Sequence, residues 1–226
     1  FEIYEADVAE SKAQFRAINE IIATLQTLGV FSEENYDTLA TKTAVHSAKL
    51  LKKPDQCRAV YMCSHLFWTG DGGETVTHLP PLRSTLFGAN IKTTAKGLQG
   101  WQESVGVLAK VTKIADGCMD SSMNVKLFVE ILNEYLYYFE HKNEAVTFPF
   151  SSLFSFYLLF ISSLGAVKYL TGLIALIKTN LANMEVGDGE NPDRAKAINT
   201  YYANTLQHIQ HKRATTAAIP YDQIEL

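Results

Sequence analysis

The chain has few cysteines, few charges and no net positive charge, and each shortage excludes a class of protein. Three cysteines in 226 residues are too few for a disulfide scaffold, and an odd count suits a reducing, cytoplasmic compartment. Charged residues make up only 19% and hydrophobic residues 47%, so the chain can bury enough apolar surface to fold. A net charge of -4 argues against a nucleic-acid partner.

Signals for secretion and for β-structure are missing as well. The first residues have no basic segment followed by an apolar one, which a signal peptide would need. Asp116-Gly117 and Asp188-Gly189 lie between helical patterns, and alternation of apolar and polar residues is not sustained anywhere. Because the sequence opens at Phe1 and not at Met, we expect a fragment of a longer protein.

What the sequence does contain is helical periodicity. Apolar residues recur at steps of three and four in three series: Ile18, Ile22, Leu25 and Leu28; Val125, Phe128, Leu132, Tyr135 and Phe139; Ala195, Ile198, Tyr202, Leu206 and Ile209. After a first helix that closes near Gly29, we predict helices over about 32–51, 54–69, 101–116, 121–141 and 192–213, with a long apolar stretch to about 182.

Residues that begin and end helices support these limits. Gly29 is placed to end the first helix, and Ser32 to cap the next one ahead of two acids. Lys52 and Lys53 suit a helix end, and Pro54 suits the first position of the following helix.

Several helices joined by short turns predict either a bundle or a solenoid of antiparallel pairs. The helix over 121–141 favours the solenoid, because Leu127, Ile131 and Leu136 form a second apolar strip that requires packing on both sides. No repeat of fixed period is present. We therefore predict an all-α fold, an irregular HEAT-like α-solenoid over 1–213, with a loop insertion at 71–99, an apolar insertion at 148–166 and a tail over 214–226.

Residues that carry chemistry do not form a catalytic pattern. Cys57 and Cys63 are six apart, whereas zinc-binding pairs are usually two to four apart, so Cys63 is interpreted as a small packed residue. His208 and His211 lack the acid of a zinc helix and are interpreted as a solvated helix end beside Lys212. The sequence thus predicts a scaffold, with no enzyme activity, cofactor or metal.

Four acids near the start, Glu2, Glu5, Asp7 and Glu10, have two interpretations. They are either the solvated start of a helix or an electrostatic contact for a basic partner, and composition favours the first.

Longer stretches carry a resemblance to a known family. They are residues 4–5, 11–14 and 31–35, the run SAKLLKKPDQCRAV over 47–60 with CSHLFW over 63–68, and LFVEILN over 127–133 with YLY over 135–137. Together they closely resemble the C-terminal part of the vacuolar protein sorting-associated protein 35 family, the large α-solenoid subunit of retromer. The resemblance covers nearly the whole chain apart from the two insertions.

The resemblance implies a subunit of a peripheral coat on the cytosolic face of endosomes, which recycles transmembrane cargo. It implies a contact with vacuolar protein sorting-associated protein 29, the phosphoesterase-fold subunit, as well as self-pairing in the coat and recruitment of the actin-nucleating WASH complex. The arrestin-like subunit would bind only an N-terminal part that is absent from this sequence.

By position, the resemblance implies partner-binding residues in two places. His65, Leu66, Phe67 and Trp68 fall in the segment that supports docking of the phosphoesterase subunit. Glu5, Asp7 and Glu10 fall in the acidic segment implicated in coat pairing or contact with the actin machinery. The family usually has Glu-Asp-Glu and then Ser-Asp there, whereas this chain has Glu-Ala-Asp and then Ala-Glu.

Two insertions depart from the family. The loop from Asp71 to about Gln99 is longer than its counterpart, which costs little in closure entropy. Residues 148–166 have no counterpart and no charge, and as a helix they would span nearly 30 Å at about 1.5 Å per residue. Three interpretations are open: a membrane anchor, an apolar hairpin or helix extension packed on the solenoid, or translated intron sequence. The high content of Phe, Leu, Ser and Tyr favours the intron. An anchor over 148–167 would make the chain a single-span helical membrane protein.

Overall fold

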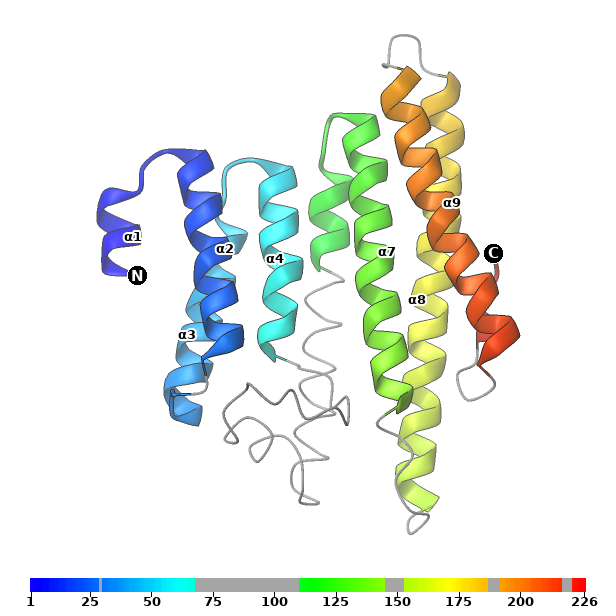
Figure 1. Cartoon of the computed structure of the whole chain (residues 1–226), viewed down its shortest axis with the longest axis horizontal. Helices are drawn as coiled ribbons and strands as arrows, with labels where there is room; N and C mark the ends of the chain where they lie inside the picture. Colours follow the sequence, from blue (N-terminus) through cyan, green and yellow to red (C-terminus); the bar gives the residue numbers. More distant parts are fainter. Residues whose placement is uncertain (29, 68–109, 145–152, 187–191, 217–220) are drawn as a thin grey trace. The chain divides into compact units, whose positions relative to one another are not determined.

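The computed structural model describes the chain except for residues 29, 68–109, 145–152, 187–191 and 217–220 (Figure 1). The described elements are helices: α1 Glu2–Asp7, α2 Ser11–Thr27, α3 Glu33–Ala48, α4 Lys53–Phe67, α7 Ser121–Glu144, α8 Leu153–Val186, α9 Pro192–Thr215 and the 3-10 turn η1 Tyr221–Gln223. The predicted all-α solenoid class is confirmed. Residues 110–116 are also helical, whereas the predicted loop insertion at 71–99 lies outside the described residues.

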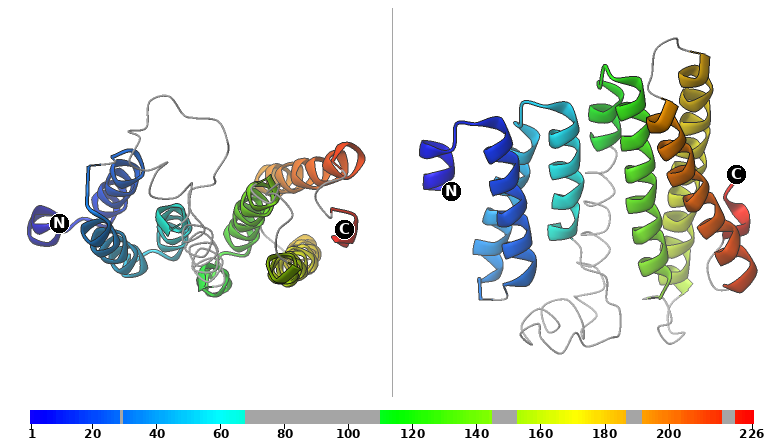
Figure 2. Two further views of the ribbon diagram at one scale, coloured as in Figure 1. Left: turned by 90° about the horizontal axis from the view of Figure 1, so that it is seen from below. Right: turned by 45° about the horizontal axis from the view of Figure 1, so that its top comes forward.

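The chain divides into two compact units, Phe1–Gly117 and Cys118–Leu226. In the first unit, α2, α3 and α4 lie side by side and pack on one another (Figure 2). The predicted seam of α2 is confirmed at Ile18, Ile22 and Leu25, which are buried. They form one core with five residues of α3, α4 and the turn between them: Ala40, Leu50, Ala59, Cys63 and Leu66.

The prediction that Leu28 is the fourth residue of this seam is wrong. The helix ends at Thr27, and Leu28 adopts an extended backbone with 40% of its surface exposed. The amide of Leu28 still donates the last helical hydrogen bond, to the carbonyl of Thr24, but its side chain no longer lies on the buried face of α2. Periodicity alone does not show where the backbone leaves the helix.

The predicted helix start at Ser32 is confirmed, because its hydroxyl oxygen accepts a hydrogen bond from the amide of Asn35, at 3.4 Å. This bond satisfies one of the amides that the first turn leaves unpaired. Pro54 occupies the second position of α4 and not the first, since the helix begins at Lys53. Either position tolerates the missing N–H. Gly29 lies outside the described residues.

In the second unit, α7 is the central helix and packs against both α8 and α9. The predicted seam of Val125, Phe128, Leu132, Tyr135 and Phe139 is buried. So are Leu127, Ile131 and Leu136, which confirms that α7 is packed on two sides. The predicted seam of α9 is buried at Ile198, Tyr202 and Ile209.

The apolar insertion joins the family-like sequence without a break in helix. α8 runs from Leu153 through Val167 to Val186, so residues 153–166 of the insertion are helical. Residues 148–152 lie outside the described residues, as do the side chains of 153–166. Within the part of the chain that the structure describes, no helix is long and apolar enough to cross a membrane.

The predicted tail over 214–226 is more than a polar extension. α9 continues to Thr215, and the chain then returns to the unit, where Tyr221 and Ile224 are fully buried. They are three residues apart: Tyr221 begins the 3-10 turn η1, and Ile224 follows it and donates its amide to the Tyr221 carbonyl at 3.2 Å. Two residues of the predicted tail, Tyr221 and Ile224, therefore belong to the core of the second unit.

Candidate partner-binding site

The first candidate surface lies at the end of α4, where the sequence singled out His65. The helix buries one face through Cys57, Cys63 and Leu66. Arg58, Tyr61 and His65 follow one another at steps of three and four and are all half-buried. They form a stripe along α4, named here the α4 stripe, that combines a cation, a phenol and an imidazole.

Of the other residues predicted beside His65, Leu66 belongs to the core of the first unit. Only 3% of its surface is exposed, and its carbonyl accepts a hydrogen bond from the Tyr36 hydroxyl, at 2.9 Å. The side chain therefore fixes the end of α4 to α3. Phe67 is the last residue of that helix; its side chain and the whole of Trp68 lie outside the described residues.

The acidic segment gives a different result for each of its members. The Glu5 carboxylate on α1 contacts Lys42 Nζ and His46 Nε2 on α3, both at 2.9 Å. The hydrogen bond from Lys42, followed by the one from His46, lowers the pKa of Glu5. Asp7 and Glu10 are exposed. The structure thus separates a carboxylate that is used within the chain from two that face solvent.

Aromatic rings reinforce the contact between α1 and α3. The ring of Phe1 stacks on His46 with centroids 5.4 Å apart, and Tyr4 meets the same imidazole edge-on at 5.2 Å. Lys42 Nζ lies 5.0 Å from the centre of the Phe1 ring. Sequence reasoning missed Lys42 and His46, and the available signal was weak: two basic residues four apart on one face of a helix.

The thiols do not form a reactive site. Cys57 and Cys63 are buried, and the Sγ of Cys63 lies 3.2 Å from the Ser47 hydroxyl. Burial raises the pKa of Cys63 to about 11, so the thiol is protonated at neutral pH and is a poor nucleophile. This confirms its interpretation as a packed residue. Among the described residues, no three His, Cys, Asp or Glu side chains are grouped to hold a metal ion.

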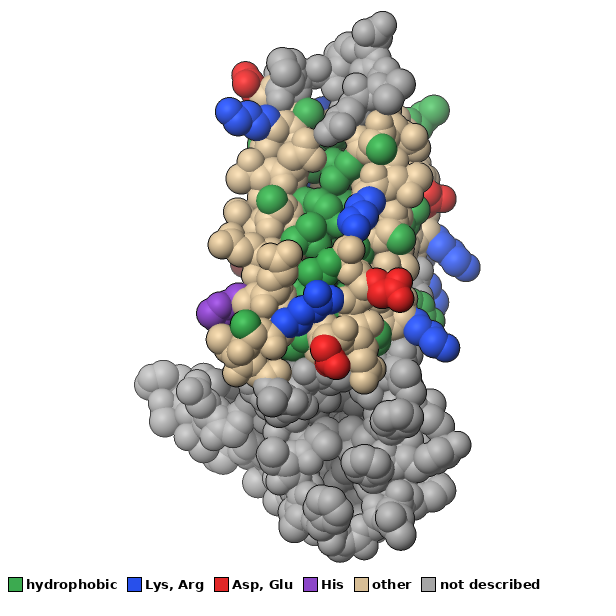
Figure 3. All heavy atoms as spheres, turned by 90° about the vertical axis from the view of Figure 1, so that its right-hand side faces the viewer, with side chains coloured by type: hydrophobic (Ala, Val, Ile, Leu, Met, Phe, Trp, Pro, Cys, Tyr) green, Lys and Arg blue, Asp and Glu red, His purple; other side chains and the backbone are tan. Residues whose placement is uncertain are grey.

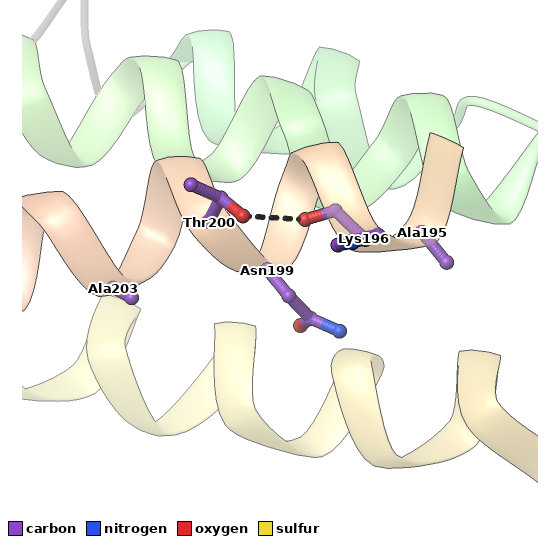
Figure 4. A pocket seen from close by; sticks show the side chains of 5 residues that line it. All are labelled: Ala195, Lys196, Asn199, Thr200 and Ala203. Atoms are coloured by element: carbon purple, nitrogen blue, oxygen red, sulfur yellow. Dashed lines mark hydrogen bonds between the residues drawn. The ribbon is translucent and has the colours of Figure 1, made fainter. Parts of the chain in front are cut away.

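A shallow hollow along α9 is lined by Ala195, Lys196, Asn199, Thr200 and Ala203 (Figure 4). Asn199 points toward α8, and the Thr200 hydroxyl bonds the Lys196 carbonyl of its own helix, at 2.9 Å. The only charged group among these five residues is the Lys196 amine, and none of the five is a carboxylate, an imidazole or a thiol. The hollow therefore lacks a nucleophile paired with a base.

The face formed by α8 and α9 shows a strip of apolar side chains between the two helices, with basic and acidic side chains beside it (Figure 3). α8 and α9 make few contacts with each other, which leaves this strip open between them. An apolar strip with a charged border has the character of a protein contact surface and not of a reaction site.

Comparison with known proteins adds a family to this geometry. A family model described as vacuolar protein sorting-associated protein 35 matches residues 1–180, which include the α4 stripe and the acidic segment. The chain belongs to the vacuolar protein sorting-associated protein 35 family. That family consists of non-catalytic trafficking scaffolds.

Individual members of the vacuolar protein sorting-associated protein 35 family show how much of the chain is shared. Protein 35B of Arabidopsis thaliana is 43% identical over 65% of the chain, and protein 35A of the same plant is 33% identical over 96%. The Schizosaccharomyces pombe protein is 33% identical over 81%. The chain spans 17%, 22% and 18% of these three relatives, about a fifth of their length.

Proposed function

We propose that the chain is part of a non-catalytic scaffold subunit of retromer, which acts at the cytosolic face of endosomes in the retrograde and recycling transport of membrane cargo. The observation that carries this proposal is the family match over residues 1–180. The packing of helices within each unit is compatible with a role in assembly.

The partner of the first unit in this proposal is the phosphoesterase-fold subunit, vacuolar protein sorting-associated protein 29. His65, at the end of the α4 stripe, is its central contact, with Arg58 and Tyr61 beside it. Leu66 contributes indirectly, because its buried side chain and its bond to Tyr36 hold the end of α4 in place. Phe67 and Trp68 remain in the proposed contact.

The acidic segment is proposed to serve coat pairing or the contact with the WASH complex. Asp7 and Glu10 are the exposed acids that would meet a basic surface. Glu5 would not touch the partner itself but would position α1, because its bonds to Lys42 and His46 hold α1 on α3. The arrestin-like subunit would bind a part of the full-length protein that this sequence does not include.

Calorimetric titration with the phosphoesterase-fold subunit tests the proposal. The wild-type chain should bind one to one, and His65→Arg should weaken binding at least about tenfold, because it places a full charge in the contact. His211→Arg is the matched control: it makes the same change at an exposed position of α9 in the other unit and should leave the affinity unchanged.

Circular dichroism of both variants should match the wild type, so that a loss of binding is not a loss of fold. Equal affinity of His65→Arg and the wild type would remove the α4 stripe from the interface. No binding by a helical wild-type chain would overturn the proposed partner.

A further inference from the structure

Residues Tyr221–Leu226, named here the C-terminal segment, lie in a site built by three helices of the second unit. α7 contributes Phe139 and Glu140, α8 contributes Thr171, and α9 contributes Arg213. The segment is attached to α9 by only five residues, 216–220. It is therefore arranged as a short peptide seated on a helical surface.

Two side chains anchor the C-terminal segment. Tyr221 and Ile224 have no exposed surface, whereas Asp222 and Gln223 between them are exposed. The Tyr221 ring meets Phe139 edge-on, with centroids 5.3 Å apart and planes at 89°, and its hydroxyl donates to the Glu140 carboxylate. An aromatic ring with a polar tip requires such a combination of apolar wall and acceptor.

The main chain of the segment is recognised as well. Arg213 Nε donates to the Tyr221 carbonyl at 2.9 Å, and the same guanidinium donates to the Ile224 carbonyl. The Glu225 amide donates to the Thr171 hydroxyl at 3.3 Å. These bonds do not depend on the side chains of the peptide, so selectivity comes from the two buried anchors. Peptide recognition in general combines such contacts with a few side chains that are buried as anchors.

We propose that this three-helix site is a peptide-binding site for a partner segment with the pattern Tyr-x-x-Ile, and that the chain's own C-terminal segment occupies it in cis. Glu140, Arg213 and Thr171 supply the polar contacts of the site, and Phe139 supplies its aromatic wall. This inference does not depend on the proposed retromer function.

The short connection determines when a partner can bind. A ligand that is joined to its site by only a few residues has an effective concentration of about millimolar, so the cis segment excludes weak competitors. A partner peptide gains access when the C-terminal segment is removed, modified or held elsewhere. The segment thus acts as an autoinhibitory ligand of the site.

The test uses the full chain and a fluorescent peptide, acetylated Tyr-Asp-Gln-Ile-Glu-Leu, with anisotropy as the measurement. Replacing both anchors, Tyr221→Ala with Ile224→Ala, should empty the site and give saturable binding. The wild type should bind at least about tenfold more weakly because its own segment competes. The control pair, Asp222→Ala with Gln223→Ala, changes only exposed residues of the segment and should behave as the wild type.

A peptide with Ala in place of Tyr should fail to bind the emptied site. Equal binding of both peptides, equal binding to wild type and emptied variant, or no binding to a helical emptied variant would each overturn the proposal. A wild-type dimer that is lost in the emptied variant would show a second copy as the occupant in trans, and would overturn the partner-peptide assignment.

If the emptied variant does not fold, a protease site placed within residues 216–220 of the wild-type chain replaces it. After cleavage the C-terminal segment is held only by non-covalent contacts, and an excess of labelled peptide should exchange with it. Failure of the cleaved, folded chain to take up the peptide would contradict the proposal.

Discussion

The Tyr221 hydroxyl donates a hydrogen bond to the Glu140 carboxylate, although 81 residues of sequence separate the two. The same carboxylate also contacts His208 Nε2 at 2.6 Å and Lys212 Nζ at 3.6 Å. One half-buried acid of α7 therefore holds α9 and the C-terminal segment together. His208 has a specific partner here, so its interpretation as part of a merely solvated helix end is incomplete.

The first prediction concerns the pH dependence of this contact. Partial burial acts to raise the pKa of Glu140, but hydrogen bonds from Tyr221 and His208 and the charge of Lys212 outweigh it and lower the pKa below the ordinary 4.5. Because the folded-state pKa is depressed, the ionised group stabilises the fold above pH 4.5, and this contribution disappears as the pH falls through the lower, folded-state value.

Glu140→Gln should therefore destabilise the chain by roughly 1.5–3 kcal/mol at pH 7, the range for hydrogen bonds to a charged group. Urea denaturation of variant and wild type at pH 7 and near pH 3 measures this difference. It should shrink at the lower pH, and a difference that is constant across the range would show that ionisation of Glu140 has no part in stability.

The second prediction concerns the buried seam of α7. Leu132→Ala or Phe128→Ala should lower the free energy of unfolding by roughly 2–5 kcal/mol, because each removes a fully buried side chain and leaves a cavity. Lys126→Ala is the control, since it alters an exposed position on the same helix and should have little effect. Denaturant melts that show no loss for either core variant would contradict the packing of α7.

The third prediction concerns two neighbouring tyrosines of α9, whose replacement by Phe should change the stability of the chain in opposite directions. The Tyr201 hydroxyl accepts a hydrogen bond from Asn133 Nδ2 at 2.7 Å. The Tyr202 hydroxyl is buried without a hydrogen-bond partner among the described residues, and burial raises its pKa to about 12. A buried hydroxyl without a partner costs free energy, whereas a bonded one contributes to stability.

Tyr201→Phe should therefore destabilise the chain by roughly 1–2 kcal/mol, because Asn133 loses its acceptor. Tyr202→Phe removes only the unpaired hydroxyl and should leave stability unchanged or raise it by about 1 kcal/mol. Thermal melts of the two variants, measured side by side, decide the matter. A larger loss for Tyr202→Phe than for Tyr201→Phe would refute the assignment of the two hydroxyls.

The fourth prediction concerns α1, which has no buried residue and is attached to α3 through Glu5, Phe1 and Tyr4. Glu5→Gln should speed hydrogen exchange of the α1 amides without changing global stability. High salt should have the same effect on the wild type, because the ion pair is partly exposed. Asp7→Asn is the control: it removes the same charge from the same helix and should leave the hydrogen-exchange rate of the α1 amides as in the wild type.

The sequence was sufficient where a local rule or a regular period governs the structure. Ser32 caps α3 because its hydroxyl reaches an amide three residues away, and the seam of α7 follows from spacing alone. Contacts between distant segments were not predictable in this way. Glu5 contacts Lys42 and His46, which are about forty residues away in the sequence. Only the folded structure shows that this acid is paired within the chain and is not free for a partner protein.

The end of the chain shows the same limit for burial. Tyr221 and Ile224 stand in a short, mostly polar stretch whose sequence resembles that of a solvated tail. Their burial depends on walls supplied by Phe139 of α7 and by other helices. For the candidate site, His65 was singled out through the family resemblance alone, and the half-buried stripe that it forms with Arg58 and Tyr61 is seen only in the structure. The burial of Leu66 beside it depends on the core that α2 and α3 complete.

The central position of α7 has a consequence for how the second unit comes apart. α8 and α9 each meet α7 far more extensively than they meet one another, so α7 is the main support of both. Loss of α7 releases both, and no stable remnant of the pair is expected. The second unit should thus behave as one cooperative folding element, in which fluorescent probes on α8 and on α9 report coincident denaturation curves.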